Sequence, residues 1–272
     1  MTGAKKLLDQ GHLGEAVEEL TRTLREKPLD SHARVFLFEL LCFQGAFERA
    51  AKQLEIMATQ SGDATTELAI QVYRDLAASE VARLAVFHGS GLPKFLAPPP
   101  PYVEHYVMLV KKMADGAADA GDQLGKAEDA TPAIAGRAGE RAFAGFRDAD
   151  DRVAPVLEVF SGGEYLWVPF EQITRLRIIE PKRLRELVWA PATLQACGQD
   201  PRDVYLPVLY VDSWLGHRDE VKLGKMTVWD AIKDQVVVGA GQRVFMLDDD
   251  DASLFELGEV EFKASVESAQ AT

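Results

Sequence analysis

The feature that most constrains the fold of this chain is a helical pattern near its start that occurs twice at a fixed offset. Gly45 aligns with Gly11 at this offset, and the apolar or small positions that follow each glycine align as well. The aligned pairs are Leu13 with Phe47, Ala16 with Ala50, Val17 with Ala51, Leu20 with Leu54, and Leu24 with Ala58. Because these positions recur at helical spacing, each copy predicts an amphipathic helix after a glycine turn.

The offset from Gly11 to Gly45 matches the period of tetratricopeptide units, about 34 residues, in which paired helices stack into a surface that holds another polypeptide. The helix predicted at residues 35–44 is apolar nearly all round, so we expect it to lie between neighbouring helices. A third stretch, at 65–88, is predicted as one long helix, because the next turn position is Ser79 and carries no turn signal. The sequence therefore predicts two repeat units followed by a longer helix.

The pattern changes from helical to extended in the second half of the chain. Residues 115–141 contain few large apolar side chains, and after them residues 156–160 and 165–168 flank a glycine pair, which predicts a β-hairpin. Further strands are predicted at 176–179, 187–189, 204–210, 243–247 and 254–262, with short helices at 181–186 and 226–233. The predicted fold class is α+β, with a tetratricopeptide-like helical domain at 1–125, a linker at 126–140 and a β-rich domain with short helices at 141–272.

Composition excludes several classes of function. The 272 residues include 43 acidic and 30 basic side chains, and the formal net charge of −13 repels phosphate backbones, so nucleic acid is not an expected partner. No run of eighteen apolar residues predicts a membrane span. Cys42 and Cys197 lie far apart without a metal-binding or disulfide spacing. These features are typical of a protein of the reducing cytoplasm.

Residues with catalytic potential are few. The five histidines form no metal-ligand motif, so neither a zinc site nor a cofactor is expected, and no residue is assigned as catalytic. Asp148, Asp150 and Asp151 cluster just before the predicted hairpin. Alternating aspartates can ligate a divalent cation, so a metal-dependent enzyme that uses this cluster is one alternative. Structural hydrogen bonding and partner binding are equally open for the segment that ends at Arg152.

All four tryptophans lie in the second half of the chain. Trp167 and Trp189 fall in predicted strands and are expected in the core, whereas Trp214 follows in a loop and is a candidate exposed anchor for a partner. A basic stretch at 175–185, which includes Arg185, either forms a solvated face or meets an acidic partner surface.

Several blocks of the second half resemble one family. Residues 143–170 read F-A-G-F-R-D-A-D-D-R-V-A-P-V-L-E-V-F-S-G-G-E-Y-L-W-V-P-F, and shorter blocks are L-V-W-A-P-A at 187–192, L-P-V-L-Y at 206–210 and G-A-G-Q-R-V at 239–244. Together they resemble the ImpE/TagJ family of accessory proteins of bacterial type VI secretion systems. The resemblance implies a non-enzymatic adaptor that binds a helix at the N-terminus of the small sheath subunit and is linked to the AAA+ ATPase that recycles contracted sheath. A general tetratricopeptide-like scaffold or chaperone is the remaining alternative.

The repeat also predicts where a partner helix binds. If the helices stack as tetratricopeptide units do, the first helix of each pair lines a concave groove. The residues predicted to line this groove are Val35, Glu39, Phe43, Ala69 and Tyr73. For the apolar members of this set, burial in the core is the alternative. A possible second partner-binding surface comprises Asp148, Asp150, Arg152 and Trp214.

Overall fold

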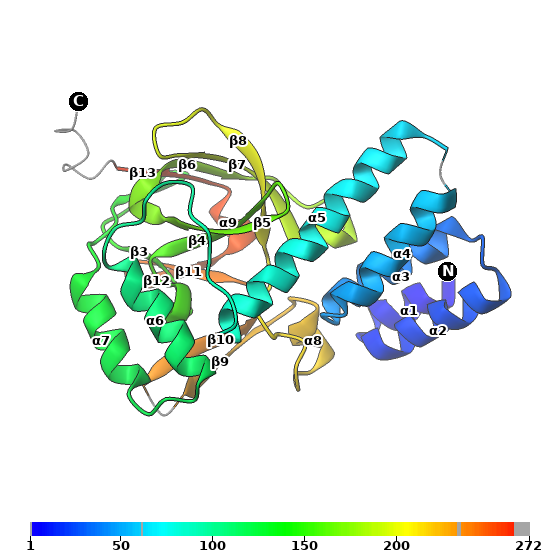
Figure 1. The fold of residues 1–272 in the computed structure, drawn as a ribbon, viewed down its shortest axis with the longest axis horizontal. Coiled ribbons are helices and arrows are strands. Elements are labelled where there is room, and N and C mark those ends of the chain that lie inside the picture. The colour runs from blue at the N-terminus through cyan, green and yellow to red at the C-terminus, as the bar shows by residue number, and fades with distance from the viewer. Residues whose placement is uncertain (1, 61, 233–234, 264–272) are drawn as a thin grey trace.

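The computed structural model describes residues 2–60, 62–232 and 235–263 (Figure 1). The helices of the first half are α1 (Thr2–Asp9), α2 (Leu13–Glu26), α3 (Ser31–Phe43), α4 (Phe47–Gln60), α5 (Ala64–Phe87), α6 (Val103–Ala114) and α7 (Ala120–Ala130). Helices α1 to α4 and the first part of α5 project to one side as an arm, and the rest of α5 runs from this arm into a β-rich body (Figure 1). Helices α6 and α7 lie against the body at the end away from the arm (Figure 1).

The two copies of the repeat form helix pairs with matching boundaries. Helices α2 and α4 both contain 14 residues, and each follows a glycine at positive φ, Gly11 at 83° and Gly45 at 66°. Glycine adopts this left-handed backbone at little cost, so the chain reverses tightly between the helices. The long helix expected at 65–88 is confirmed as α5, whose first turn is capped by Asp63 through a bond from the Thr66 amide (2.9 Å).

The body is built around one eight-stranded sheet in the order β2-β1-β13-β6-β7-β8-β4-β5, in which neighbours run antiparallel. Its strands are β1 (Gly136–Ala138), β2 (Arg141–Phe143), β4 (Val156–Ser161), β5 (Glu164–Pro169), β6 (Ile173–Ile178), β7 (Trp189–Ala196), β8 (Arg202–Pro207) and β13 (Glu259–Phe262). A second sheet contains β3 (Phe146–Asp148), β11 (Val244–Leu247) and β12 (Asp250–Ser253), and a hairpin contains β9 (Thr227–Ile232) and β10 (Val236–Gly241). Short helices are η1 (Asp151–Val153), η2 (Phe170–Gln172), η3 (Leu184–Leu187), α8 (Asp219–Lys222) and α9 (Leu254–Leu257).

The predicted hairpin is confirmed as β4 and β5, and both of its faces are buried. Val156 and Phe160 point toward the helices, whereas Leu157 and Val159 point into a second apolar cluster inside the body. Because alternate residues of a strand face opposite sides, burial on both sides produces the continuous apolar run seen in the sequence. This hairpin therefore connects the helical region to the interior of the body.

Helices and sheet share one buried core. Leu41 of α3 and Val103 of α6 belong to the same apolar cluster as Trp167 of β5 and Trp189 of β7, so the core placement of both tryptophans is confirmed. Residues 126–140, predicted as a linker, contain the end of α7 and strand β1. Small side chains such as Ala127 let α7 pack closely, and the same composition had suggested a loop. The domain division at residue 125 stays a prediction.

Several local predictions in the second half were wrong. Residues 227–232 form strand β9 and not a short helix, since pairing with β10 decides their conformation; Lys233 lies outside the described residues. The strand expected at 254–262 is interrupted by α9 and Gly258, and only its second half is the strand β13. The strand expected at 187–189 begins at Trp189 and runs on to Ala196. Thirteen strands occur in the described residues, about twice the predicted number.

Candidate functional site

The contact between the arm and the body, which we call the seam, is the site where the predicted groove residues meet the rest of the chain. Its centre is Trp189 at the start of β7. The ring centroid of Trp189 lies 6.3 Å from those of Phe38, Phe47 and Tyr73, which come from α3, α4 and α5. Aromatic pairs at such distances add to the stabilisation that burial provides. One side chain of the sheet therefore holds three helices of the arm.

The segment around α8 closes the same seam from a second direction. Trp214 packs edge-on against Phe47, with 5.4 Å between ring centroids. Its ring covers Gly45 so closely that a Cβ on this glycine would lie 2.3 Å from a ring atom. Asp219 of α8 accepts a hydrogen bond from the first amide of α2, Leu13 N (2.8 Å). A carboxylate is favourable at this position because the helix N-terminus is electropositive.

Arg185 of η3 joins the face formed by α3 and α5 to the body. Its guanidinium donates to Glu39 Oε1 (2.9 Å) and to the Tyr73 hydroxyl (2.7 Å), and it lies 4.8 Å from the centroid of the Tyr73 ring. Burial raises the pKa of Glu39, although the neighbouring Arg185 acts in the opposite direction. The chain's own η3 thus covers this part of the face formed by α3 and α5.

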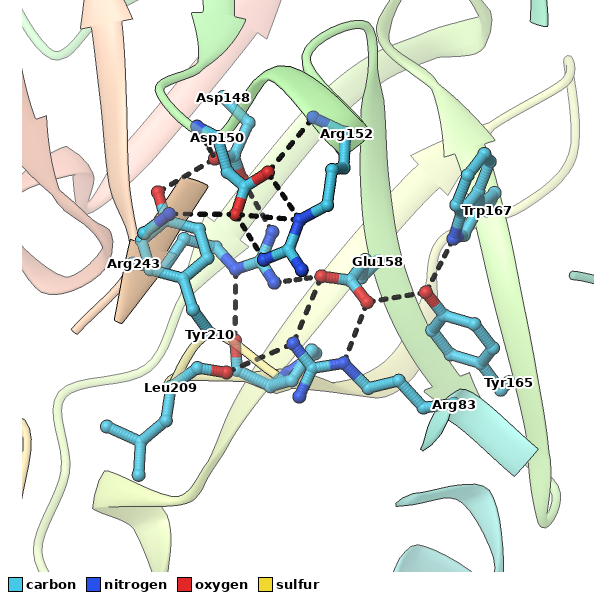
Figure 2. Close-up of polar contacts among 12 residues, drawn as sticks. Arg83, Asp148, Asp150, Arg152, Glu158, Tyr165, Trp167, Leu209, Tyr210 and Arg243 are labelled. Atoms are coloured by element: carbon cyan, nitrogen blue, oxygen red, sulfur yellow. Dashed lines mark hydrogen bonds and ion pairs between the residues drawn. The ribbon is translucent and has the colours of Figure 1, made fainter. Parts of the chain in front are cut away.

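Behind the aromatic contacts lies a buried network of charged side chains (Figure 2). Glu158 of β4 stands at its centre and accepts from Arg83 of α5, with 2.8 Å between Nε and Oε1, and from Arg243. The Tyr165 hydroxyl donates to the same carboxylate. Burial alone would raise the pKa of Glu158, but the two guanidinium groups lower it to about 2. The network therefore fastens α5 to the sheet through a carboxylate that stays ionised.

The aspartates identified in the sequence belong to this network. Asp148 accepts from Tyr210 Oη (2.8 Å) and Asp150 N (2.9 Å) on one oxygen and from Arg243 on the other. Burial raises the pKa of Asp148 to about 6, while Arg243 acts to lower it. Asp150 is bound by the Arg152 guanidinium, with 2.9 Å from Nε to Oδ1. Both aspartates lie at the boundary between β3 and η1, in the interior of the protein.

The same aspartates also fix the position of the β9–β10 hairpin. Gly239 N donates to Asp150 (3.0 Å) and Val237 N donates to Asp151 (2.6 Å), whose other oxygen is bound by Arg147. These amides lie on the edge of β10 that faces away from β9. The carboxylates thus accept the hydrogen bonds that a third strand would accept at this edge.

The hydrogen bonds leave the aspartate cluster no open position for a cation. Each of the six carboxylate oxygens of Asp148, Asp150 and Asp151 accepts from an arginine, a tyrosine or a backbone amide. Such partners stabilise the carboxylates in place of a metal ion. The interpretation as structural hydrogen bonding is therefore supported, and the alternative of a metal-dependent enzyme built on these residues is not.

The network contains one more acid than base. Glu80 of α5 accepts from Trp189 Nε1 (3.1 Å) and from Arg83 (3.3 Å), which connects the charged network to the aromatic seam. Burial raises the pKa of Glu80, and the nearby Glu158 adds to this effect. The ion-paired groups of this network are three guanidiniums, Arg83, Arg152 and Arg243, and four carboxylates, Glu80, Asp148, Asp150 and Glu158. Burial is the main cause of the raised pKa values of Glu80 and Asp148, and the neighbouring carboxylates Glu158 and Asp150 add to it.

The predicted partner-binding residues are therefore divided by the structure. Phe43 is 0% exposed, so its predicted place in an open groove is wrong and the alternative of core burial holds. Glu39 is buried under Arg185, and Tyr73 is half-buried under the same side chain. Val35 is half-buried and Ala69 is exposed, so a partner-binding role for these two stays a prediction.

The four residues predicted as a possible second partner-binding surface do not form an exposed surface. Asp148 and Asp150 are fully buried, and Arg152 is bound to Asp150. Trp214 is half-buried against Phe47 and is not an exposed anchor. A loop position had suggested exposure, but the loop folds back onto the arm.

Sequence reasoning missed the residues that organise the network. Glu158 interrupts the apolar run of β4, and Arg83 occupies a buried position of α5 between Leu76 and Val86. Each element has a charged residue where its pattern calls for an apolar one. This was the signal in the sequence that pointed to a buried ion pair, since buried charges occur in pairs.

The fold and the seam define an α+β protein in which a helical repeat arm is fixed to a β-rich body. Residues 140–261 match the family described as ImpE protein. The chain is 34% identical over 261 residues to the "Type VI secretion system accessory component TagJ" of Pseudomonas aeruginosa, covering 96% of this chain and 91% of that protein. The chain thus belongs to the ImpE family and is a homologue of a type VI secretion accessory component, which confirms the resemblance found in the sequence.

A solved structure has the same fold. The crystal structure of protein VPA1032 from Vibrio parahaemolyticus matches with a TM-score of 0.90 at 26% identity, covering 98% of this chain and 99% of that one. The predicted α+β class with an N-terminal helical region is thereby confirmed. None of the helices in the described ranges combines the length and hydropathy that crossing a bilayer requires.

Proposed function

We propose that this protein is a non-enzymatic, cytoplasmic adaptor of a type VI secretion system. Its arm binds the helix at the N-terminus of the small sheath subunit, and the protein links the sheath to the AAA+ ATPase that recycles it. The relationship to TagJ supports the secretion system as the setting. The engaged carboxylates of the aspartate cluster support a binding role over a catalytic one.

The partly open face formed by α3 and α5 is the observation that carries this proposal. Val35 and Ala69 occupy equivalent positions of α3 and α5, related by the offset of the repeat, and Glu39 and Tyr73 form the next equivalent pair. Arg185 covers the second pair. The first pair lies about one helical turn away, beyond the reach of these hydrogen bonds.

The open part of the face suits an amphipathic helix. Leu68, beside Ala69 near the start of α5, is 69% exposed and offers an apolar contact to such a helix. Side chains one turn apart on a partner helix have the same spacing as side chains one turn apart along α3 and α5. The covered pair at Glu39 and Tyr73 gives the face a fixed end, because η3 blocks further extension toward the body.

The test uses a fluorescent peptide that contains the N-terminal helix of the small sheath subunit encoded in the same genome. Fluorescence anisotropy should show that Ala69→Glu weakens binding at least about tenfold, which corresponds to about 1.4 kcal/mol. The matched control is Ala78→Glu, at an exposed position of the same helix, and it should bind like the wild type. Equal affinity of the two variants, or absence of binding by the wild type, would refute the proposed binding face.

A second measurement tests the adaptor role. In size-exclusion chromatography, the AAA+ ATPase should elute together with the sheath peptide when this protein is present and separately when it is omitted. A general scaffold or chaperone predicts a different result, since it would bind unrelated amphipathic helices with similar affinity. Selective binding of the sheath helix therefore separates the two functions.

A further inference from the structure

A large apolar pocket lies in the body at the end away from the arm, between α6, α7 and the second sheet. Its volume is about 610 Å³. The apolar part of its lining includes Ile134, Phe146, Ala154, Pro155 and Met246. We propose that this pocket is a second docking site, which receives an apolar side chain of a partner peptide flanked by lysine or arginine. The site is independent of the proposed sheath-helix face.

Most of the pocket wall is apolar, and several of its polar side chains already form hydrogen bonds. The Tyr106 hydroxyl at its wall lies 3.2 Å from the Thr131 hydroxyl, and both oxygens of Asp151 already accept hydrogen bonds. Within the described part of the chain, the buried polar side-chain atoms without a partner belong to Arg34, Tyr102 and Asp212, which do not line the pocket. An apolar side chain therefore fits this wall, and the polar contacts offered to a partner are those of the charged side chains at the rim.

The charges at the rim determine the flanking residues of the partner. Glu128, Asp151 and Asp248 line the pocket together with one cation, Arg147, so the rim is acidic by two charges. Arg147 is bound to Asp151 and lies 3.4 Å from Glu128, whereas Asp248 accepts from the backbone amides of the chain before β3. The formal charge of the whole protein, −13, has the same sign. Lysine or arginine next to the anchor would be attracted at the distances, about 8 Å, over which charges act at physiological salt.

The apolar surface continues beyond the pocket, which favours a peptide over a single small group. Val237 of β10 lines the pocket and is 38% exposed. It pairs with Ala231, and the next pair on the same face is Gly239 with Trp229, which is 41% exposed. The aspartates that hold the edge of β10 fix this surface in place. A preformed surface binds with a smaller loss of conformational entropy.

The experiment is a selection from a random peptide display library on the full-length protein, with counter-selection on the Val237→Lys variant. Peptides that distinguish the two proteins should carry leucine, isoleucine or an aromatic residue next to lysine or arginine. Val237→Lys should weaken such a synthetic peptide at least about tenfold. The matched control is Val81→Lys on α5, an exposed valine outside the pocket, which should bind like the wild type.

A second variant tests the rim separately from the apolar contact. Glu128→Gln should weaken the same peptide about two- to fivefold at low salt, and the difference should vanish at high salt because the attraction is screened. The proposal is overturned if no peptide distinguishes wild type from Val237→Lys, or if the selected anchors are flanked by acidic residues. It is also overturned if Ala69→Glu abolishes binding of the selected peptides and Val237→Lys does not, since they then bind the arm.

Discussion

Replacing Arg83 with methionine tests whether the buried network joins the arm to the body. Arg83 donates to Glu158 (2.8 Å), to the backbone oxygen of Leu209 (3.1 Å) and to Glu80 (3.3 Å). Breaking a buried ion pair by removing one partner costs about 3 to 5 kcal/mol. We expect a loss of about 3 kcal/mol for Arg83→Met, because Glu158 keeps Arg243 as a partner and methionine fills much of the volume.

The assay is urea unfolding followed by tryptophan fluorescence, since Trp167 and Trp189 are buried beside the network. The matched control is Arg175→Met, which breaks an exposed ion pair with Glu259 and should change the free energy of unfolding by less than about 1 kcal/mol. Adding Glu80→Gln to Arg83→Met should recover about 1 to 2 kcal/mol, because it removes the carboxylate left without a cation. A loss for Arg83→Met no larger than that of the control would refute the reasoning.

The pH dependence of the Arg83→Met variant gives a further check. Burial already raises the pKa of Glu80 above its usual 4.5, and loss of Arg83 removes a group that lowers it. A carboxyl group with a raised pKa contributes stability that is present below the unfolded pKa and lost as the pH rises through the folded one. The destabilisation should therefore be largest at pH 7 and smaller near pH 5. A constant difference across this range would contradict the expectation.

Substitutions at Asp148 and Gly45 test the buried network and the contact with Trp214. The pKa of Asp148 is raised from 3.8 to about 6, so its contribution to the free energy of unfolding is present below pH 3.8 and is lost as the pH rises through about 6. In urea unfolding, Asp148→Asn should therefore remove up to about 3 kcal/mol of the pH dependence of stability between pH 4 and 7. A pH dependence equal to that of the wild type would contradict this expectation. Gly45→Ala should cost about 2 to 3 kcal/mol, because the new Cβ meets the Trp214 ring, whereas Gly11→Ala should cost only about 1 kcal/mol. Equal costs at the two glycines would show that contact with Trp214 contributes nothing.

The repeat made the helices of the arm predictable, but not what covers them. Its offset identifies Glu39 and Tyr73 as neighbours on one face, and Arg185 indeed contacts both. The sequence also marked Arg185 as part of a basic stretch with two possible roles, a solvated face or an acidic partner. Only the folded structure shows that the acidic partner of Arg185 is Glu39 of the same chain, because periodicity describes one element at a time.

Short strands were missed for a related reason. Strands β1, β2 and β3 contain three residues each, which is too few to display an alternating pattern. In β9 most side chains are exposed on both faces, so the sequence carries no alternation, and its pairing with β10 determines the strand. The hairpin β4–β5 was predictable because a glycine turn lies between two long apolar runs.

The bond between Asp219 and the first amide of α2 has a consequence for how the protein is made. These partners are 206 residues apart in the chain. At a synthesis rate of about 5 to 20 residues per second, the ribosome adds Asp219 about 10 to 40 s after Leu13. During that interval the arm has neither this cap nor Trp189 and Trp214 against its aromatic residues. A nascent chain that stalls before residue 189 would therefore present Phe38 and Phe47 to the chaperones of the cell.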